Sequence, residues 1–172
     1  MLDRLKLPAL AAMIVAAMAL PEAGSAQCLL ANPSFEIPGS GTAFGGWNQF
    51  GIVASSSEAV HGGVAARLTG PDLGGWDLSA IWQKLDAAPG EQWSASITAW
   101  HSAAKPLTGQ SRAILNVEWR DSGGSLISYE SHTVLDANSP LDTPQWFNVI
   151  SSPAPTGTAS THFLFGALQS PT

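Results

Sequence analysis

The sequence predicts an all-β protein, a β-sandwich of two antiparallel sheets, and three observations support this fold class. Short runs rich in β-branched and aromatic residues recur along the chain, separated by Gly, Pro, Ser, Asn and Asp. Regular spacing of such runs is typical of sandwiches and barrels. Apolar and polar residues alternate with a period of two, and a helical period is nearly absent. The 7 Trp and 6 Phe supply bulky side chains for a core between two sheets.

The clearest strand is EQWSASITAW, residues 91–100. Trp93 and Ile97 fall on one face of this strand, and Trp100 falls on the other face among small polar residues. Residues 111–120 alternate in the same way, and the turn DSGG leads into a hairpin partner at 125–135. Further strands are predicted at 51–60, 65–70, 78–87, 145–152 and 160–168.

The first 26 residues have the pattern of a secretory signal peptide. Arg4 and Lys6 precede a short apolar run at 8–20, and the small residues Gly24 and Ala26 follow it. The apolar run is shorter than the roughly 20 residues that a membrane-spanning helix needs. The sequence therefore predicts a chain secreted to the periplasm or the extracellular space, with one soluble domain at residues 27–172.

Charge and cysteine content argue against several classes of protein. The formal net charge is −6, and the basic residues after position 27 are scattered, so no patch for nucleic acid is visible. These residues are Arg67, Lys84, Lys105, Arg112 and Arg120. Cys28 is the only cysteine, which rules out an internal disulfide and a thiolate zinc site. Lipid attachment to Cys28 is disfavoured because the preceding residue, Gln27, is not small.

The sequence predicts no enzymatic activity. The 4 His lie in separate segments without metal-ligand spacing, and no nucleophile elbow, phosphate loop or Cys–His pair occurs. Glu118 and Glu130, on adjacent predicted strands, are the one pair that suggests the two carboxylates of a glycoside hydrolase. Exposed or hydrogen-bonded carboxylates are the commoner explanation for such residues.

The order of several short motifs resembles that of a family of carbohydrate-binding modules. The motifs are LLANPSFE, GGW, VHGGVAARLTG, IWQKLDAAPGEQWSASITAW, VEWRDSGGSLIS and TPQWFNVISSPAPTGTASTHFLF. Between Leu29 and about Leu168 they resemble the family 4/9/22-like modules found beside bacterial cellulases and xylanases. The resemblance implies a galactose-binding-like jelly-roll fold and a non-catalytic, secreted module for a polysaccharide or oligosaccharide. The same fold also serves as a plain structural module.

The resemblance also implies a final strand that this chain does not show. In similar modules a strand carrying an Asp pair follows the FLF segment and lies beside the first strand, whereas this chain reads GALQSPT after that segment. We therefore expect an unpaired edge along the first strand, where a partner chain could complete the sheet. The alternative function is a structural or assembly module of an extracellular protein with no sugar ligand.

For a sugar ligand, strand alternation points to one polar sheet face. Aromatic rings stack on the apolar face of a pyranose, and amides and carboxylates bind its hydroxyls. The predicted site has Trp100 as its main platform, Arg112, Asn116 and Glu118 on the floor of the same cleft, and Trp76 and Trp82 on one wall. The remaining Trp are predicted to lie in the core: Trp47, Trp93, Trp119 and Trp146.

The resemblance further implies a structural Ca²⁺ at the edge of the sandwich. Glu36 of the NPSFE motif would be its carboxylate ligand, and carbonyls near residues 61–63 would add oxygens. Ca²⁺ takes about six to eight oxygen ligands, and the Asp that the final strand contributes in similar modules is absent. Glu36 is therefore either a calcium ligand or the end of a turn.

Overall fold

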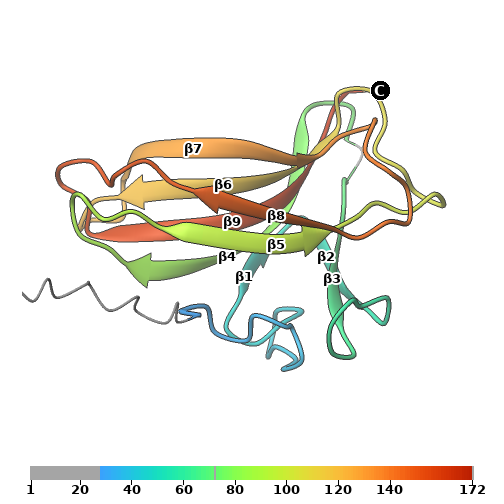
Figure 1. Cartoon of the computed structure of the whole chain (residues 1–172), viewed down its shortest axis with the longest axis horizontal. Coiled ribbons are helices and arrows are strands. Elements are labelled where there is room, and N and C mark those ends of the chain that lie inside the picture. Colours follow the sequence, from blue (N-terminus) through green and yellow to red (C-terminus); the bar gives the residue numbers. More distant parts are fainter. Residues whose placement is uncertain (1–27, 72, 172) are drawn as a thin grey trace, which may run out of the picture.

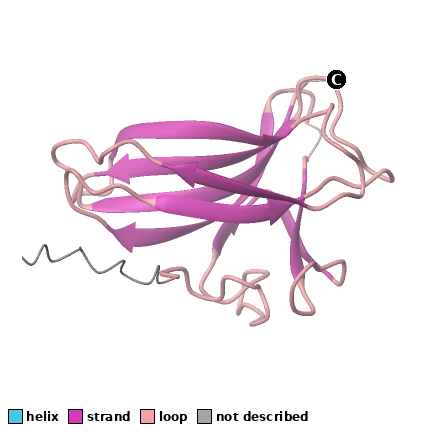
Figure 2. Ribbon diagram, in the orientation of Figure 1, coloured by secondary structure: helices cyan, strands magenta, loops and turns pink. Residues whose placement is uncertain are grey.

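The computed structural model describes residues 28–71 and 73–171, which form strands and no helix (Figures 1 and 2). The strands are β1 (Asn48–Phe50), β2 (Ile52–Ser56), β3 (Ala65–Thr69), β4 (Asp77–Asp86), β5 (Ser94–Ala99), β6 (Arg112–Arg120), β7 (Leu126–Leu135), β8 (Gln145–Ile150) and β9 (Ser160–Gln169). The predicted signal peptide lies outside the described residues. Within the described ranges there is no apolar helix of membrane-spanning length. Cys28 is exposed and has a free thiol.

The strands form two layers, which confirms the predicted sandwich of antiparallel sheets. One layer is a five-stranded sheet with the order β1-β4-β9-β6-β7, and the other contains the pairs β2-β3 and β5-β8. All of these strand ladders are antiparallel. β5 and β8 lie along the larger sheet, and the β2-β3 pair lies beside one end of it (Figure 1).

The core lies between the two layers and is built from every second residue of the central strands. Leu115, Val117 and Trp119 of β6 are almost completely buried, and Phe163 and Phe165 of β9 lie beside them. From the second layer, Ile97 and Phe147 pack against this cluster. Burial of such side chains is the main favourable contribution to folding.

Three of the four Trp predicted for the core lie there, and the fourth does not. Trp47 and Trp119 are buried, and Trp93 packs against the core with its ring centroid 5.7 Å from that of Phe163. Trp146 is 69% exposed, so the prediction for this residue is wrong. Its neighbour Phe147 packs against the core, and consecutive residues of a strand point to opposite faces.

The NPSFE motif forms a turn that holds the GGW motif in place. The Asn32 side chain donates hydrogen bonds to the carbonyls of Ile37 and Gly45, at 2.9 and 3.0 Å. The Trp47 indole in turn donates to the carbonyl of Asn32 at 2.9 Å. The Phe35 ring packs against Trp47, with the ring centroids 5.1 Å apart. These hydrogen bonds and ring contacts therefore hold the two motifs together against the core.

The last strand in sequence order, β9, occupies the centre of the larger sheet. It pairs with β4 on one side and with β6 on the other. β1 lies at one edge of the sheet and pairs with β4 alone among the described strands. β9, which contains the FLF segment, therefore joins the two halves of this sheet.

Burial predicts opposite outcomes for two tryptophan substitutions. We expect Trp119→Ala to lower the free energy of unfolding by about 3–5 kcal/mol, because it removes a fully buried ring and leaves a cavity. Trp146→Ala should change it by less than about 0.5 kcal/mol, because that ring is mostly in water. Urea denaturation of both variants measures the difference, and similar losses would contradict the described core.

Candidate functional site

The face of the five-stranded sheet that points away from the core gathers polar and aromatic side chains. We call it the outer face. The ladders place Trp82 of β4 beside Leu164 of β9, and Leu164 beside Asn116 of β6. In the next row Lys84, His162 and Glu118 are neighbours in the same way. Because the second layer packs on the opposite face, these side chains are not covered by it. The main members of the outer face are Trp82, Lys84, Arg112, Asn116, Glu118, Arg120, Tyr129 and His162.

An aromatic platform lies in the middle of the outer face. The rings of Trp82 and His162 stack with their centroids 4.5 Å apart and an interplanar angle of 16°. Both residues are half-buried, so the stack is anchored on the sheet while part of its surface stays in contact with solvent. An indole held in this way presents a rigid apolar surface to a ligand.

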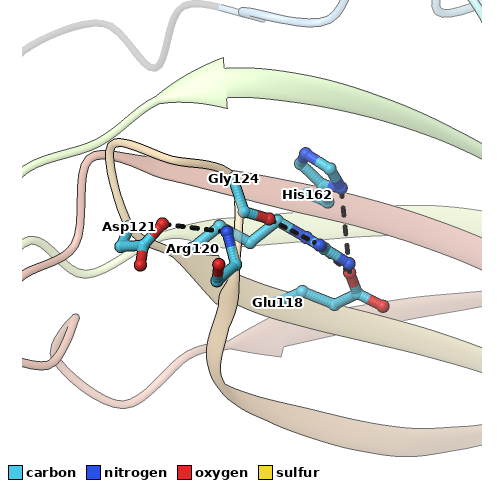
Figure 3. Close-up of polar contacts among 6 residues, drawn as sticks. Glu118, Arg120, Asp121, Gly124 and His162 are labelled. Atoms are coloured by element: carbon cyan, nitrogen blue, oxygen red, sulfur yellow. Dashed lines mark hydrogen bonds and ion pairs between the residues drawn. The ribbon is translucent and has the colours of Figure 1, made fainter.

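Beside the platform, a charged pair fixes one carboxylate (Figure 3). Arg120 donates to Glu118 Oε2 from Nη2 at 2.6 Å and from Nε at 3.1 Å. Its Nη1 donates to the carbonyl of Gly124 at 2.9 Å, which ties the guanidinium to the β6–β7 turn. His162 Nδ1 lies 3.7 Å from the same Glu118 oxygen. These contacts all use Oε2, so Oε1 is the oxygen that Glu118 can offer to a ligand.

The environment of His162 favours its neutral form. Burial lowers the pKa of His162 below its ordinary value of 6.5, and the nearby positive charges of Arg120 and Lys84 lower it further. Glu118 acts in the opposite direction and does not outweigh them. At neutral pH the ring is therefore an uncharged partner for the indole, with one nitrogen able to accept a hydrogen bond.

Asn116 contributes an unusual polar atom to the same face. Its Oδ1 is buried and has no hydrogen-bond partner among the described residues. An unpaired buried acceptor costs about 1–3 kcal/mol. A ligand hydroxyl would remove this cost once a rotation of the Asn116 amide turns the oxygen towards solvent. In the ladders, Asn116 lies between Leu164 of β9 and Ser131 of β7, one row from Glu118.

The structure brings four of the six predicted ligand-binding residues onto this face, namely Trp82, Arg112, Asn116 and Glu118. Trp76 lies just before β4 and is half exposed, and the Arg112 guanidinium is 5.9 Å from its ring centroid, so Trp76 adjoins the same face.

Trp100 does not join this group. It follows β5 in the second layer, whereas Arg112, Asn116 and Glu118 belong to β6 in the five-stranded sheet, so the expected common cleft does not form. Trp100 instead lines a cavity beside β5. Its participation in ligand binding stays a prediction.

Sequence reasoning missed four members of the outer face, namely Lys84, Arg120, Tyr129 and His162. A signal for His162 was present, because strict alternation in STHFLF places it opposite Phe163 and Phe165. Arg120 could be placed by the same rule, since it shares its parity with Glu118. No pattern within a single strand indicates that these residues meet, because their proximity depends on the order β4-β9-β6.

The structure separates Glu118 from Glu130. Glu118 is the ladder partner of Tyr129, and Glu130 is the partner of Val117, a core residue. Glu130 therefore points to the opposite side of β7, where its carboxylate accepts a hydrogen bond from the Ser152 N–H at 2.9 Å. The two carboxylates do not face a common substrate position, as a pair that hydrolyses a glycoside must.

Glu36 contacts the loop near residues 61–63, which the sequence predicts as its neighbour at a Ca²⁺ site. Backbone N–H groups of this loop make the contacts, and its carbonyl oxygens do not. Its Oε1 accepts hydrogen bonds from the N–H groups of Gly63 and Val64 at 2.9 and 3.2 Å. Within the described residues no group of three or more His, Cys, Asp or Glu could hold a metal ion. The contacts present thus fit a turn held by a carboxylate, and the expected Ca²⁺ stays a prediction.

Neither a known protein family nor a curated protein matches this sequence. Several solved structures are similar. One is the enzymatically active domain of tailspike protein 4 of bacteriophage CBA120, with 12% identity and a TM-score of 0.49. The match covers 73% of this chain and 17% of that one, so the matched part is about a sixth of the length of that domain.

Two other similar structures are carbohydrate-binding modules. A family 16 module has 15% identity and a TM-score of 0.46, and the match covers 74% of this chain and 83% of that one. The CBM22-1 xylan-binding domain of Xyn10C from Paenibacillus barcinonensis has 16% identity and a TM-score of 0.46, with 72% and 81% covered. Because these TM-scores lie below 0.5, we take the fold and the site from the strands and side chains described above.

The lowered pKa of His162 predicts how stability depends on pH. As the pH falls below 6.5, the unfolded chain binds a proton at this residue before the folded chain does, so the free energy of unfolding decreases. We expect His162→Asn, which cannot titrate, to reduce this loss of stability in urea denaturation between about pH 7.5 and pH 5. An unchanged pH dependence in the variant would contradict the assignment.

Proposed function

We propose that the chain is a non-catalytic carbohydrate-binding module that holds a polysaccharide or oligosaccharide against the outer face of the five-stranded sheet. The observation that carries this proposal is the Trp82–His162 stack beside the unpaired Oδ1 of Asn116. The predicted signal peptide supports a module that works outside the cytoplasm, in the periplasm or the extracellular space.

The chemistry of a pyranose matches this arrangement. One face of the ring carries axial C–H bonds and stacks on an indole, while its hydroxyls project sideways and donate hydrogen bonds. The Asn116 amide lies in the same row as Trp82, and Glu118 Oε1 lies in the same row as His162, so both acceptors flank the platform. An open sheet face leaves room for an extended sugar chain. It buries little of that chain, so we expect weak to moderate affinity.

The positions of the carboxylates support sugar binding better than they support glycoside hydrolysis. Arg120 donates to the Glu118 carboxylate at 2.6 Å, so that carboxylate is held in place as a hydrogen-bond acceptor. Glu130 lies on the other face of β7 and is bound to Ser152. The outer face therefore has groups that orient hydroxyls, and Glu118 and Glu130 do not form the acid and base pair of a glycosidase.

A second candidate function, an assembly module completed by another chain, is favoured by a cavity in the second layer. The cavity has a volume of about 570 Å³ and is bordered by residues 65–70 on one side and 97–102 on the other. Each border consists of six consecutive residues. Because side chains alternate along a strand, such a border is the backbone edge of the strand rather than one of its faces.

These two edges are available for pairing. Among the described strands, β3 pairs only with β2, and β5 pairs only with β8. The floor between them is apolar and includes Ile81, Leu135 and Phe165. A β-strand from another chain would hydrogen-bond to both edges and cover this floor. The sequence predicts a free edge along the first strand, and β1 is an edge strand of the larger sheet; the edges of β3 and β5 at the cavity are additional.

For the sugar-binding function we expect Trp82→Ala to weaken binding at least about tenfold, which is ~1.4 kcal/mol, because it removes the stacking surface. A glycan array on residues 27–172, with and without Ca²⁺, selects the ligand, and calorimetry measures the affinities. Trp146→Ala and Trp100→Ala are the controls, since both rings lie in the other layer, and they should retain binding. Melting temperatures of all variants separate lost binding from lost folding.

The opposite pattern, in which Trp100→Ala abolishes binding and a folded Trp82→Ala retains it, would transfer the site to the cavity beside β5. Absence of binding to every glycan on the array would remove the function altogether.

For the assembly function, we expect residues 27–172 to form dimers or larger species in light scattering as concentration rises. Backbone amides of β3 and β5 should exchange rapidly with deuterium in the monomer and slowly in the assembly, because pairing protects edge amides. A folded monomer at all concentrations, with both edges already protected, would exclude this function.

A further inference from the structure

In the ladders of β4, β9 and β6, the outer face carries three Lys or Arg residues and two carboxylates, Asp86 and Glu118, although the chain as a whole is acidic. The chain carries a formal net charge of −6, and five Lys and Arg follow residue 27. Three of these five, Lys84, Arg112 and Arg120, lie on the outer face according to the ladders of β4, β9 and β6. Solubility alone does not account for cations gathered on one face, because the acidic remainder already keeps the chain charged.

Two of these cations lack a carboxylate partner. Arg120 is neutralised by Glu118 at 2.6 Å. Lys84 and Arg112 form no ion pair within the described part of the chain. The Arg112 guanidinium instead lies 5.9 Å from the Trp76 ring centroid, which leaves its charge without an opposite charge beside it. Both residues are exposed, so their positive ends are accessible to a ligand.

The two unpaired cations lie on either side of the aromatic platform along the strands. Lys84 is one row from Trp82 in one direction, and Arg112 is two rows away in the other. A row corresponds to two residues, or about 7 Å along a strand. An extended sugar chain that crosses the platform along the strands would therefore pass close to both positive charges.

We infer that the ligand of the outer face is an anionic polysaccharide whose pyranose rings carry carboxylates, that is, a chain containing uronic acids. The inference rests on the proposed sugar-binding function and names its substrate class. A uronic acid has its carboxylate at the edge of the ring, so one sugar can stack on Trp82 while its neighbours present carboxylates to Lys84 and Arg112. Guanidinium groups match the planar geometry of a carboxylate.

The electrostatics of His162 agree with this assignment. Burial is the main cause of the lowered pKa of His162; Arg120 and Lys84 lower it further, and Glu118 raises it. The electric field of Arg120 and Lys84 therefore acts at the platform, partly offset by that of Glu118. A bound carboxylate would offset that field and raise the pKa of His162. A neutral sugar would bring no charge and would produce no such electrostatic effect.

The experiment compares two ligands with the same backbone, β-1,4-glucan oligosaccharides and β-1,4-glucuronan oligosaccharides of equal length. We expect calorimetry at about 50 mM NaCl to give an affinity at least about tenfold higher for the glucuronan, and the ratio should shrink at about 500 mM NaCl. NMR titration should show a higher pKa of His162 in the glucuronan complex than in the free protein.

Two double variants with equal changes in net charge provide the matched test. Lys84→Gln with Arg112→Gln should lower the glucuronan affinity about tenfold more than it lowers the glucan affinity. Arg67→Gln with Lys105→Gln removes two charges at the rim of the second-layer cavity, and it should leave both affinities within about twofold.

Each outcome of these measurements decides one of the two proposals. Equal binding of glucan and glucuronan, with Trp82→Ala weakening both, overturns the uronic-acid inference and leaves the sugar-binding function in place. An equal loss in the two double variants also overturns the inference, because only overall charge would then matter. A sulfated galactan bound as tightly as the glucuronan overturns the preference for carboxylates. Binding of neither oligosaccharide, or binding unaffected by Trp82→Ala, counts against the proposed function itself.

Discussion

The alternation of side chains across β4, β9 and β6 is the constraint on which the rest of the structure depends. Ile81, Val117 and Phe163 face the core from these three strands, Lys84, Glu118 and His162 face outward, and the three patterns are in register. Because consecutive strand residues point to opposite faces, Phe163 faces the core while His162 faces outward. A shift of one residue in any ladder would move aromatic rings into water and bury charged groups. The same pattern therefore specifies both the core and the candidate site.

Close packing at the base of the outer face explains how an exposed surface can be rigid. Ala80, Ile114 and Leu164 are buried even though they point away from the core. Gly166 makes this possible, because a Cβ at that position would lie 2.7 Å from Leu78 Cδ1. Trp82 and Asn116 are therefore held by a packed apolar layer of their own. Little conformational freedom remains to be lost when a ligand binds, which favours affinity on an open surface.

Much of the fold could be predicted from the sequence, because strand alternation is a local property. The runs at 111–120 and 160–168 differ from the observed β6 and β9 by one residue at one end. β1 was missed because three residues are too few to show a period. The prediction for Trp146 is wrong because consecutive residues of a strand point to opposite faces. Phe147 packs against the core, so Trp146 points to solvent.

The candidate site was only partly predictable, because sheet membership is not a local property. β5 and β6 follow each other in the sequence and both alternate, yet they belong to different layers. A sequence period assigns Trp100 and Asn116 to a face of a strand and cannot say which strands are neighbours. Trp82 and His162 are far apart in the chain and meet only because β9 inserts between β4 and β6.

The central position of β9 has a consequence for how the chain acquires its structure during synthesis. While residues 160–169 are still missing, β4 and β6 have no common neighbour, and the larger sheet exists only as the separate pairs β1-β4 and β6-β7. These pairs cannot close a core, and their open edges are prone to aggregation. Folding is therefore completed only after nearly the whole of this sequence has been synthesised. Until then, the nascent chain must be kept extended and prevented from aggregating.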